Sequence, residues 1–334
     1  MRERISIIGA GSWGTTLAVI LAQNDKEVEL HSVFREHNRV MSKERMNRLF
    51  LKGIKFPPLL KINDSLRSVL NNKIIILAVP VKFLKECLKK IKKLNINFKD
   101  KIFVSVAKGI EVSSLKRPSE IIQEQLGNVK IAVLSGPTIA KEVVKGIPTT
   151  CIVASKNKKI AKRVQYALST SRFRIYHHYD VLGVELAGAL KNIIAIACGV
   201  SDGLGFGTNT KAALLSRGLV EIVRLGKKMG ACPSTFWGIS GLGDLATTCF
   251  SPYSRNRFVG EQIGKGRKLK EILNKMEMIA EGINTVYSAY ILSKKMKIEM
   301  PITSEVYKVL YRNKKPHDAV NDLMMRPLKP ETVK

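Results

Sequence analysis

Short apolar runs alternate with longer mixed stretches through the first half of the chain. Continuous apolar runs of this length are typical of strands that are buried on both faces of a parallel sheet. The predicted strands are residues 4–8, 27–31, 73–79, 101–107, 130–134, 149–154 and 172–176, and the first predicted helix is 12–24. Strands that alternate with helices indicate an α/β fold, a Rossmann-type doubly wound sheet.

From about residue 180 helical patterns replace the strands. The predicted helices are residues 183–200, 211–229, 254–264, 269–275, 285–294, 302–311 and 316–325. Pro301 and Pro316 each open one of them, because proline is well tolerated in a first helical turn. A chain of 334 residues can form two domains. We predict a Rossmann-type dinucleotide-binding domain over residues 1–178 and an all-α domain over residues 179–334.

Lys191 lies in the most apolar of these helices, residues 183–200, GVELAGALKNIIAIACGV. A helix that is apolar nearly all round is a buried one, and an ammonium group there is costly unless it is paired or used. Burial lowers the pKa of a lysine toward neutrality, where it can act as an acid or a base. The alternative is a lysine at the helix edge with its ammonium in water. The rest of the sequence favours the catalytic interpretation.

The sequence GAGSWG, residues 9–14, has the GxGxxG pattern between the first predicted strand and the first predicted helix. In this position Gly9 permits a tight turn, Gly11 lets the backbone approach a pyrophosphate, and Gly14 lets the helix pack closely on the strand. The helix N-terminus then binds the phosphates. Glycine-rich turns also recur for structural reasons, but this placement predicts binding of NAD or NADP.

The end of the second strand bears on the choice of cofactor. NAD sites usually carry an acidic residue there, whereas this strand ends in His31 and Ser32, with Arg35 shortly after. Glu29 lies inside the strand. The missing acid and the nearby arginine predict a preference for NADP over NAD, unless Arg35 is an ordinary surface arginine.

The composition restricts the class of protein. Lys and Arg number 57 against 27 Asp and Glu, which gives a formal net charge of +30. The charge is compatible with a nucleic-acid or membrane partner, with anionic ligands, or with a compositional bias. The lysines are scattered and are not interleaved with aromatic residues, so we expect a solvated surface and no nucleic-acid binding.

Five dispersed cysteines predict neither a disulfide framework nor a metal site. No apolar run approaches the ~20 residues of a membrane helix, and the N-terminus has no signal-peptide pattern. These features predict a cytoplasmic protein with no integral membrane segment.

Four further clusters carry polar groups suited to binding. Lys108 follows one predicted strand and the turn 134–138 follows the next, at the carboxyl edge where α/β sheets bind ligands. Asp244 lies in a GLGDLATT segment. Ser254, Arg255 and Asn256 offer a hydroxyl, a guanidinium fork and an amide, which suit a phosphate. Each could be only a loop or a cap, and Ser254 could be only an N-cap.

Together these motifs resemble the bacterial-type NAD(P)-dependent sn-glycerol-3-phosphate dehydrogenases. The resemblance covers nearly the whole chain. It includes GAGSWGTTLA, AKGIE, LSGPTIAKEV, GVELAGALKNIIAIACGVSDGLGFGTNTKAAL, GLGDLATTCFSPYSRN, AEGINT and PITSEVYKVLY in the family's order. Small departures occur at Ala107, Thr138 and Thr208, where the family often has Thr, Ser and Asp.

The resemblance implies roles for individual residues. Lys191 is implied as the proton donor or acceptor. The implied substrate contacts are Lys108, Gly136, Thr138, Lys191, Asp244, Ser254, Arg255 and Asn256. The implied cofactor contacts are Ser12, Trp13, Lys108, Ala140, Arg255, Ile279 and Glu281. They add to the contacts already predicted from the glycine turn and the second strand, which are Gly9, Gly11, Gly14 and Arg35. The resemblance also implies a homodimer and an activity that feeds phospholipid synthesis.

The residues fit ketone reduction. The cofactor supplies a hydride, and a lysine of lowered pKa supplies the proton and stabilises the developing alkoxide. A neighbouring Lys108 would lower that pKa further. We therefore predict interconversion of dihydroxyacetone phosphate and sn-glycerol 3-phosphate in a cleft between the two domains. A different β-hydroxyacid-type dehydrogenase is the nearest alternative, and a basic nucleic-acid- or membrane-binding protein on a dinucleotide fold is a more distant one.

Overall fold

The computed structural model describes residues 3–276, 279–328 and 330–331. It contains two compact units. The first is formed by the segments Met1–Ala107 and Pro118–Val181, and the second by Lys108–Arg117 and Leu182–Lys334. The ten residues 108–117 therefore pack with the helical second unit, although the residues on either side of them belong to the sheet.

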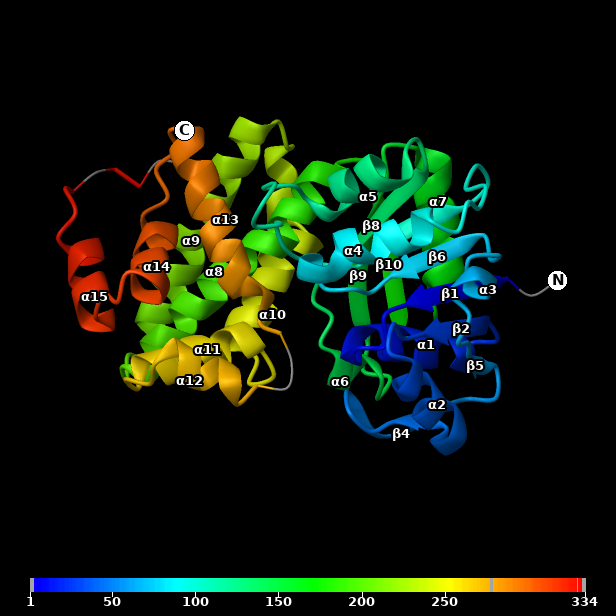
Figure 1. The fold of residues 1–334 in the computed structure, drawn as a ribbon. Helices are drawn as coiled ribbons and strands as arrows, with labels where there is room; N and C mark the ends of the chain where they lie inside the picture. The colour runs from blue at the N-terminus through cyan, green and yellow to red at the C-terminus, as the bar shows by residue number, and fades with distance from the viewer. Residues whose placement is uncertain (1–2, 277–278, 329, 332–334) are drawn as a thin grey trace. The chain divides into compact units, whose positions relative to one another are not determined.

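The first unit is built on an eight-stranded sheet in the described part of the chain (Figure 1). Its strands, in spatial order, are β10 (Phe173–His178), β9 (Thr149–Ala154), β8 (Lys130–Ser135), β7 (Ile102–Ser105), β6 (Ile74–Leu77), β1 (Arg4–Ile8), β2 (Glu27–His31) and β5 (Leu60–Ile62). Neighbouring strands are parallel except β8 and β9, which are antiparallel. A separate hairpin joins β3 (Met46–Asn47) to β4 (Leu51–Lys55).

Helices cover both faces of this sheet, which explains why its strands are continuously apolar. Ile74 and Ile76 of β6 pack in the cluster that contains residues of α1 (Ser12–Gln23), α2 (Arg35–Glu44) and α7 (Lys158–Leu168). Ile75 and Leu77 point to the opposite face. There they pack in the cluster that contains residues of α3 (Leu66–Val69), α4 (Val81–Lys92) and α5 (Pro118–Leu126).

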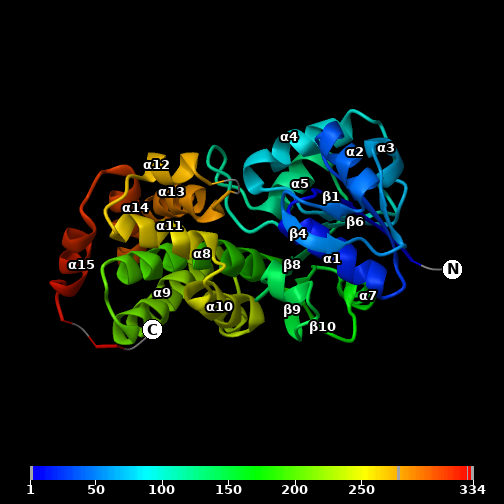
Figure 2. The same cartoon turned by 90° about the horizontal axis from the view of Figure 1, so that it is seen from below.

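The second unit is helical (Figure 2). Its α-helices are α8 (Val181–Gly203), α9 (Thr208–Met229), α10 (Asp244–Phe250), α11 (Arg255–Gly264), α12 (Leu269–Asn274), α13 (Glu281–Lys295), α14 (Pro301–Tyr311) and α15 (Pro316–Met324). A 3₁₀ turn, Pro233–Trp237, and a π-helical turn, Ile239–Gly243, precede α10. The α/β class with a helical C-terminal part is confirmed.

Close glycine contacts bring α11 against α8. A Cβ at Gly199 of α8 would lie 2.0 Å from the carbonyl oxygen of Arg257. A Cβ at Gly260 of α11 would lie 2.0 Å from the carbonyl oxygen of Ile196. The two backbones can approach this closely because neither residue has a side chain. Among the described residues α8 is the one helix long and apolar enough to cross a membrane, but its most apolar stretch is almost wholly buried in the protein.

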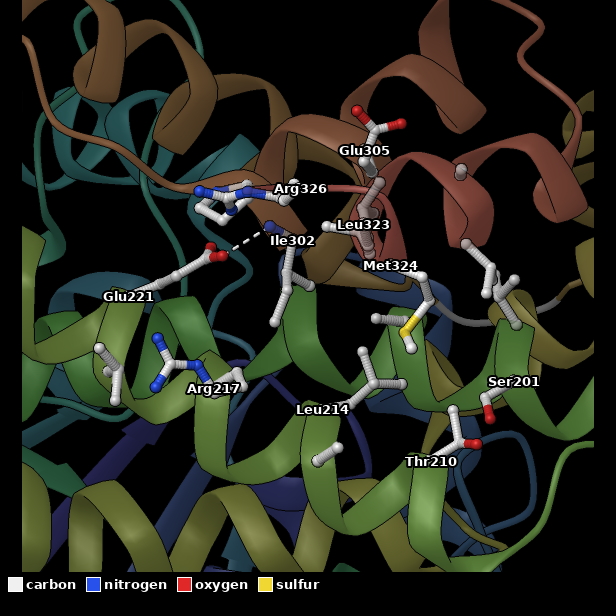
Figure 3. A pocket seen from close by; sticks show the side chains of 18 of the residues that line it. Ser201, Thr210, Leu214, Arg217, Glu221, Ile302, Glu305, Leu323, Met324 and Arg326 are labelled. Atoms are coloured by element: carbon white, nitrogen blue, oxygen red, sulfur yellow. Dashed lines mark hydrogen bonds between the residues drawn. The ribbon is translucent and has the colours of Figure 1, made fainter. Parts of the chain in front are cut away.

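A cavity of about 510 Å³ lies among α8, α9, α14 and α15 (Figure 3). Leu214, Ile302 and Met324 point into it from α9, α14 and α15. Glu221 of α9, which is 2% exposed, accepts a hydrogen bond from the backbone amide of Ile302 and so caps α14. Burial raises the pKa of Glu221 to about 7. The lining contains none of the residues predicted to carry chemistry.

Candidate active site

The glycine-rich turn between β1 and α1 leaves room where a phosphate would approach. Gly9 has φ +112°, and a Cβ there would lie 2.4 Å from the carbonyl oxygen of Ala78. A Cβ at Gly14 would lie 2.0 Å from the carbonyl oxygen of Gly9. By contrast, nothing lies within 4 Å of a Cβ built on Gly11. Gly11 is the N-cap residue of α1, and because it has no side chain it accepts no side-chain capping hydrogen bond from the first amides of this helix. This open helix N-terminus fits the pyrophosphate of a dinucleotide.

The β3–β4 hairpin, which was not predicted, supports the turn from the outside. Asn47, which is fully buried, donates from Nδ2 to the carbonyl oxygen of Ala10 and to Oγ1 of Thr15, both at 2.8 Å. Ser12 donates from Oγ to the carbonyl oxygen of Phe50 at 2.7 Å. These bonds fix the conformation of the turn before any ligand binds. In the sequence, Asn47 alone could have indicated this contact, and nothing in the residues around it distinguishes it.

Trp13 and the turn after β8 are further features predicted in this unit. The Trp13 ring packs edge-on against Phe173, with 6.1 Å between the ring centroids. In the turn Gly136 has φ +138°, and Thr138 donates from Oγ1 to the Gly136 carbonyl at 3.0 Å. Ala140 opens α6 (Ala140–Val143), and its carbonyl oxygen accepts a hydrogen bond from Thr16 Oγ1 of α1 at 3.4 Å. The predicted Ala140 therefore lies against the helix that follows the glycine turn.

No carboxylate ends β2. Ser32 is held from both sides by the buried Asn38, whose Oδ1 accepts from the Ser32 amide at 2.7 Å and whose Nδ2 donates to the Ser32 carbonyl at 2.8 Å. Glu29 lies within β2 and accepts from the amide groups of Asn63 and Asn72. Arg35 is exposed at the first position of α2, directly after this rigid strand end.

In the helical unit two lysines share one buried carboxylate. Lys191 of α8 donates from Nζ to Oδ1 of Asp244 at 2.5 Å, and Lys108 donates from Nζ to Oδ2 of the same residue at 2.7 Å. Asp244 is 1% exposed and Lys191 is 5% exposed, whereas the Lys108 side chain is 19% exposed. Lys191 also donates to Thr248 Oγ1 at 2.5 Å, one turn beyond Asp244 on α10. Lys191 is therefore a buried, fully oriented cation.

The pKa of Lys191 is lowered to about 8. Burial is the largest cause, and the positive charge of Lys108 lowers the pKa further, while Asp244 opposes both effects. A lysine with this pKa exchanges its proton near neutral pH, as an acid–base group must. Thr248 was not predicted as a site residue, although its position four residues after Asp244 places both on one helical face.

Asn192 and Asn256 connect the lysine cluster to α11. Asn256 donates from Nδ2 to Oδ1 of Asn192 at 2.9 Å, and its own Oδ1 accepts from the amide of Gly282 at 3.0 Å. Both asparagines are buried. Asn192, the neighbour of Lys191 on α8, was not predicted. The bond places the start of α11 beside the part of α8 that carries the lysine.

The start of α11 is suited to a phosphate. Ser254 is the N-cap, and its Oγ accepts from the amide of Arg257 at 3.2 Å. Ser254 therefore caps the helix, and its hydroxyl hydrogen is still available for donation to a ligand. Arg255 is exposed and donates to the carbonyl oxygen of Ile279 at 2.7 Å. Ile279 and Glu281, the first residue of α13, thus lie in the neighbourhood of Arg255.

Comparisons with known proteins agree with this geometry. Residues 4–161 match the family model described as NAD-dependent glycerol-3-phosphate dehydrogenase N-terminus, and residues 180–321 match the corresponding C-terminus. A glycerol-3-phosphate dehydrogenase [NAD(P)+] of Citrifermentans bemidjiense is 49% identical over 337 residues, which cover all of both chains. One of Thermoanaerobacter is 47% identical, with 98% of each chain covered.

Solved structures give the same result. The crystal structure of glycerol-3-phosphate dehydrogenase from Coxiella burnetii has a TM-score of 0.93 and 37% identity, and covers 97% of this chain and 99% of its own. The Plasmodium falciparum glycerol-3-phosphate dehydrogenase has a TM-score of 0.89 and 25% identity, and covers 98% of this chain and 97% of its own. The chain belongs to the NAD-dependent glycerol-3-phosphate dehydrogenase family.

Proposed function

We propose that the protein interconverts dihydroxyacetone phosphate and sn-glycerol 3-phosphate with NAD(P)H or NAD(P)+, in the manner of its named relatives. The observation that carries this proposal is the buried Lys191 held on Asp244 beside Lys108. Reduction of the ketone supplies glycerol 3-phosphate for phospholipid synthesis.

Lys191 is the acid–base group. In the direction of reduction its ammonium donates a proton to the ketone oxygen of the substrate, and in the reverse direction the neutral amine accepts the proton of the hydroxyl. Asp244 and Thr248 fix the position of Nζ. Lys108 supplies a second positive charge that stabilises the developing alkoxide. The nicotinamide, when bound, supplies or accepts the hydride.

Arg255 and the N-terminus of α11 bind the phosphate of the substrate. A guanidinium fork matches phosphate oxygens, and the first amides of the helix and the Ser254 hydroxyl add further donors. This binding is remote from the ketone carbon and orients it toward Lys191. Through its hydrogen bond to Asn192, the neighbour of Lys191, Asn256 holds the phosphate site at a fixed position relative to Lys191. We also propose Gly136 and Thr138 as substrate contacts.

The dinucleotide is held by the turn Gly9–Gly14, with Ser12 and Trp13 in the turn and Ala140 beside α1. Lys108, Arg255, Ile279 and Glu281 contribute the cofactor contacts of the helical unit. The exposed Arg35 and the absence of a carboxylate at the end of β2 support a preference for NADP over NAD. We further infer that the protein is a homodimer. We also infer a cytoplasmic location, for which the five free thiols are the support.

The identity of the product tests the proposal. Purified protein is incubated with dihydroxyacetone phosphate and NADPH, and the product is identified and its chirality assigned. The expected product is sn-glycerol 3-phosphate, formed in equal amount to the NADPH consumed. Oxidation of a β-hydroxyacid panel with no turnover of glycerol 3-phosphate would instead support the other dehydrogenase class.

A further inference from the structure

The segment Lys108–Arg117 is anchored near its start in the helical unit. Ile110 is 2% exposed and lies in the hydrophobic core of that unit, and Leu115 packs against the same core. The Oγ of the fully buried Ser288 of α13 lies 3.1 Å from the carbonyl oxygen of Ile110 and shares its hydrogen between this oxygen and the Asn284 carbonyl, also at 3.1 Å. Lys108 therefore lies at the start of a segment that is fastened to the helices.

The segment is also closed on itself. The amide of Glu111 donates to the carbonyl oxygen of Lys116 at 3.0 Å, and the amide of Leu115, with φ +58°, donates to the Glu111 carbonyl at 3.0 Å. The Glu111 carboxylate accepts from the Ser113 hydroxyl and the Ser114 amide, both at 2.8 Å. These bonds tie Glu111 to Lys116, so the Lys108 end and the Arg117 end of the segment are connected more directly than by the chain between them.

An ion pair fixes the far end of the segment. Arg117 donates from Nη1 to Oε2 of Glu185, and the two side chains are only 13% and 3% exposed. Glu185 lies on α8, the helix that carries Lys191 six residues later. Removal of one partner of a buried pair leaves an uncompensated charge, so the contact is strongly specified. None of the chemistry described above uses this pair.

We propose that Arg117 and Glu185 are positioning residues that fasten segment 108–117 to α8 and thereby keep the Lys108 ammonium on Asp244 beside Lys191. The proposal rests on the function given above, because it assumes that Lys191 is the acid–base group. Its physical basis is the geometry of one helix: α8 carries both Lys191 and the carboxylate that holds the segment bearing Lys108.

A shift in the titration of Lys191 distinguishes positioning from mere stabilisation. The groups that face Lys191 are Asp244, Thr248 and Cys249 of α10, and Lys108 of the segment. The Lys108 charge lowers the pKa of Lys191 and Asp244 raises it. When Lys108 moves away, the repulsion is lost and Asp244 pairs with Lys191 alone. Both changes raise the pKa of Lys191.

The test is the pH dependence of kcat for sn-glycerol 3-phosphate oxidation, which needs neutral Lys191. In Glu185→Gln the inflection is expected to lie higher than in the wild type by roughly half a pH unit or more, because one neighbouring positive charge is lost. Glu305→Gln is the matched control, because it removes a similarly buried carboxylate that pairs with Lys308 and Lys314 elsewhere in the helical unit. Its inflection is expected to coincide with that of the wild type.

A second, milder variant provides an independent test if Glu185→Gln does not fold. Arg117→Lys keeps the charge and loses the fork, and its inflection is expected to lie between those of wild type and Glu185→Gln. Inflections at the wild-type pH in both variants, or in Arg117→Lys alone if Glu185→Gln does not fold, would overturn the positioning proposal. A wild-type protein that does not oxidise glycerol 3-phosphate would instead overturn the proposed function.

Discussion

Replacement of Lys191 by methionine separates its chemical role from its packing role. Methionine is unbranched and apolar and refills the space of the lysine stem. If Lys191 is the acid–base group, kcat is expected to fall by ~10²–10⁴-fold, the usual contribution of general acid–base catalysis. Binding of NADPH is expected to persist, because the turn Gly9–Gly14 belongs to the other unit.

The same substitution has an expected effect on stability whose sign follows from the pKa. Folding lowers the pKa of Lys191 from 10.5 to about 8. This difference corresponds to at most about 3 kcal/mol of unfavourable free energy for the charged form at pH 7. Asp244 keeps Lys108 as a partner in the variant. The free energy of unfolding at pH 7 is therefore expected to be unchanged or to increase by up to that amount.

The penalty depends on pH in a definite direction. Since the folded pKa lies below the unfolded one, the cost of the charged lysine is complete below pH 8 and disappears as the pH rises from 8 to 10.5. Thermal unfolding at pH 7 and at pH 10 is expected to show a larger advantage of Lys191→Met at pH 7. A variant that retains more than about a tenth of wild-type kcat, or an advantage that grows with pH, would refute the reasoning.

Three further outcomes are expected. Arg255→Lys keeps the charge but loses the bidentate fork, so kcat/KM for dihydroxyacetone phosphate falls at least ~10-fold, whereas Arg267→Lys, an exposed control in the same unit, leaves it unchanged. Arg35→Ala raises KM for NADPH more than KM for NADH, and Arg39→Ala on the same helix affects neither; a lower wild-type KM for NADH would contradict this interpretation of β2. The pKa of Glu221 is raised to about 7, so its contribution to the free energy of unfolding is complete below pH 4.5 and is lost as the pH rises through 7. The free energy of unfolding of Glu221→Gln, measured by chemical denaturation, is expected to lack this pH dependence. Identical pH profiles of variant and wild type would argue against this role of Glu221.

The sheet was predictable because its strands are apolar on both sides. The bounds of β1, β2 and β9 agree with the prediction, and the other four predicted strands differ by one or two residues at one or both ends. No prediction covered β5 of the main sheet, the β3–β4 hairpin, the helices α2 to α7, or α10. The apolar residues of α4 do recur with helical spacing among its lysines. The helix was nevertheless missed, because the continuous apolar strands on either side of it are the stronger signal.

The candidate site was predictable where a residue is chemically unusual for its surroundings. Lys191 was identified because a charge in an apolar helix demands a partner, and the structure supplies Asp244. Asn47, Asn192 and Thr248 were missed because a neutral polar residue is unremarkable until its neighbours are known. The assignment of Lys108 to the helical unit was also unpredictable, since local sequence places it after a strand of the sheet.

The central claim is that the helical unit binds a phosphorylated ketone through Arg255 and the start of α11 and protonates it from Lys191. Initial rates of NADPH oxidation with dihydroxyacetone phosphate and with dihydroxyacetone, at equal concentration, test this claim most directly. Rapid oxidation with the phosphorylated ketone and negligible oxidation with the other are expected. Equal rates with the two ketones would contradict the claim.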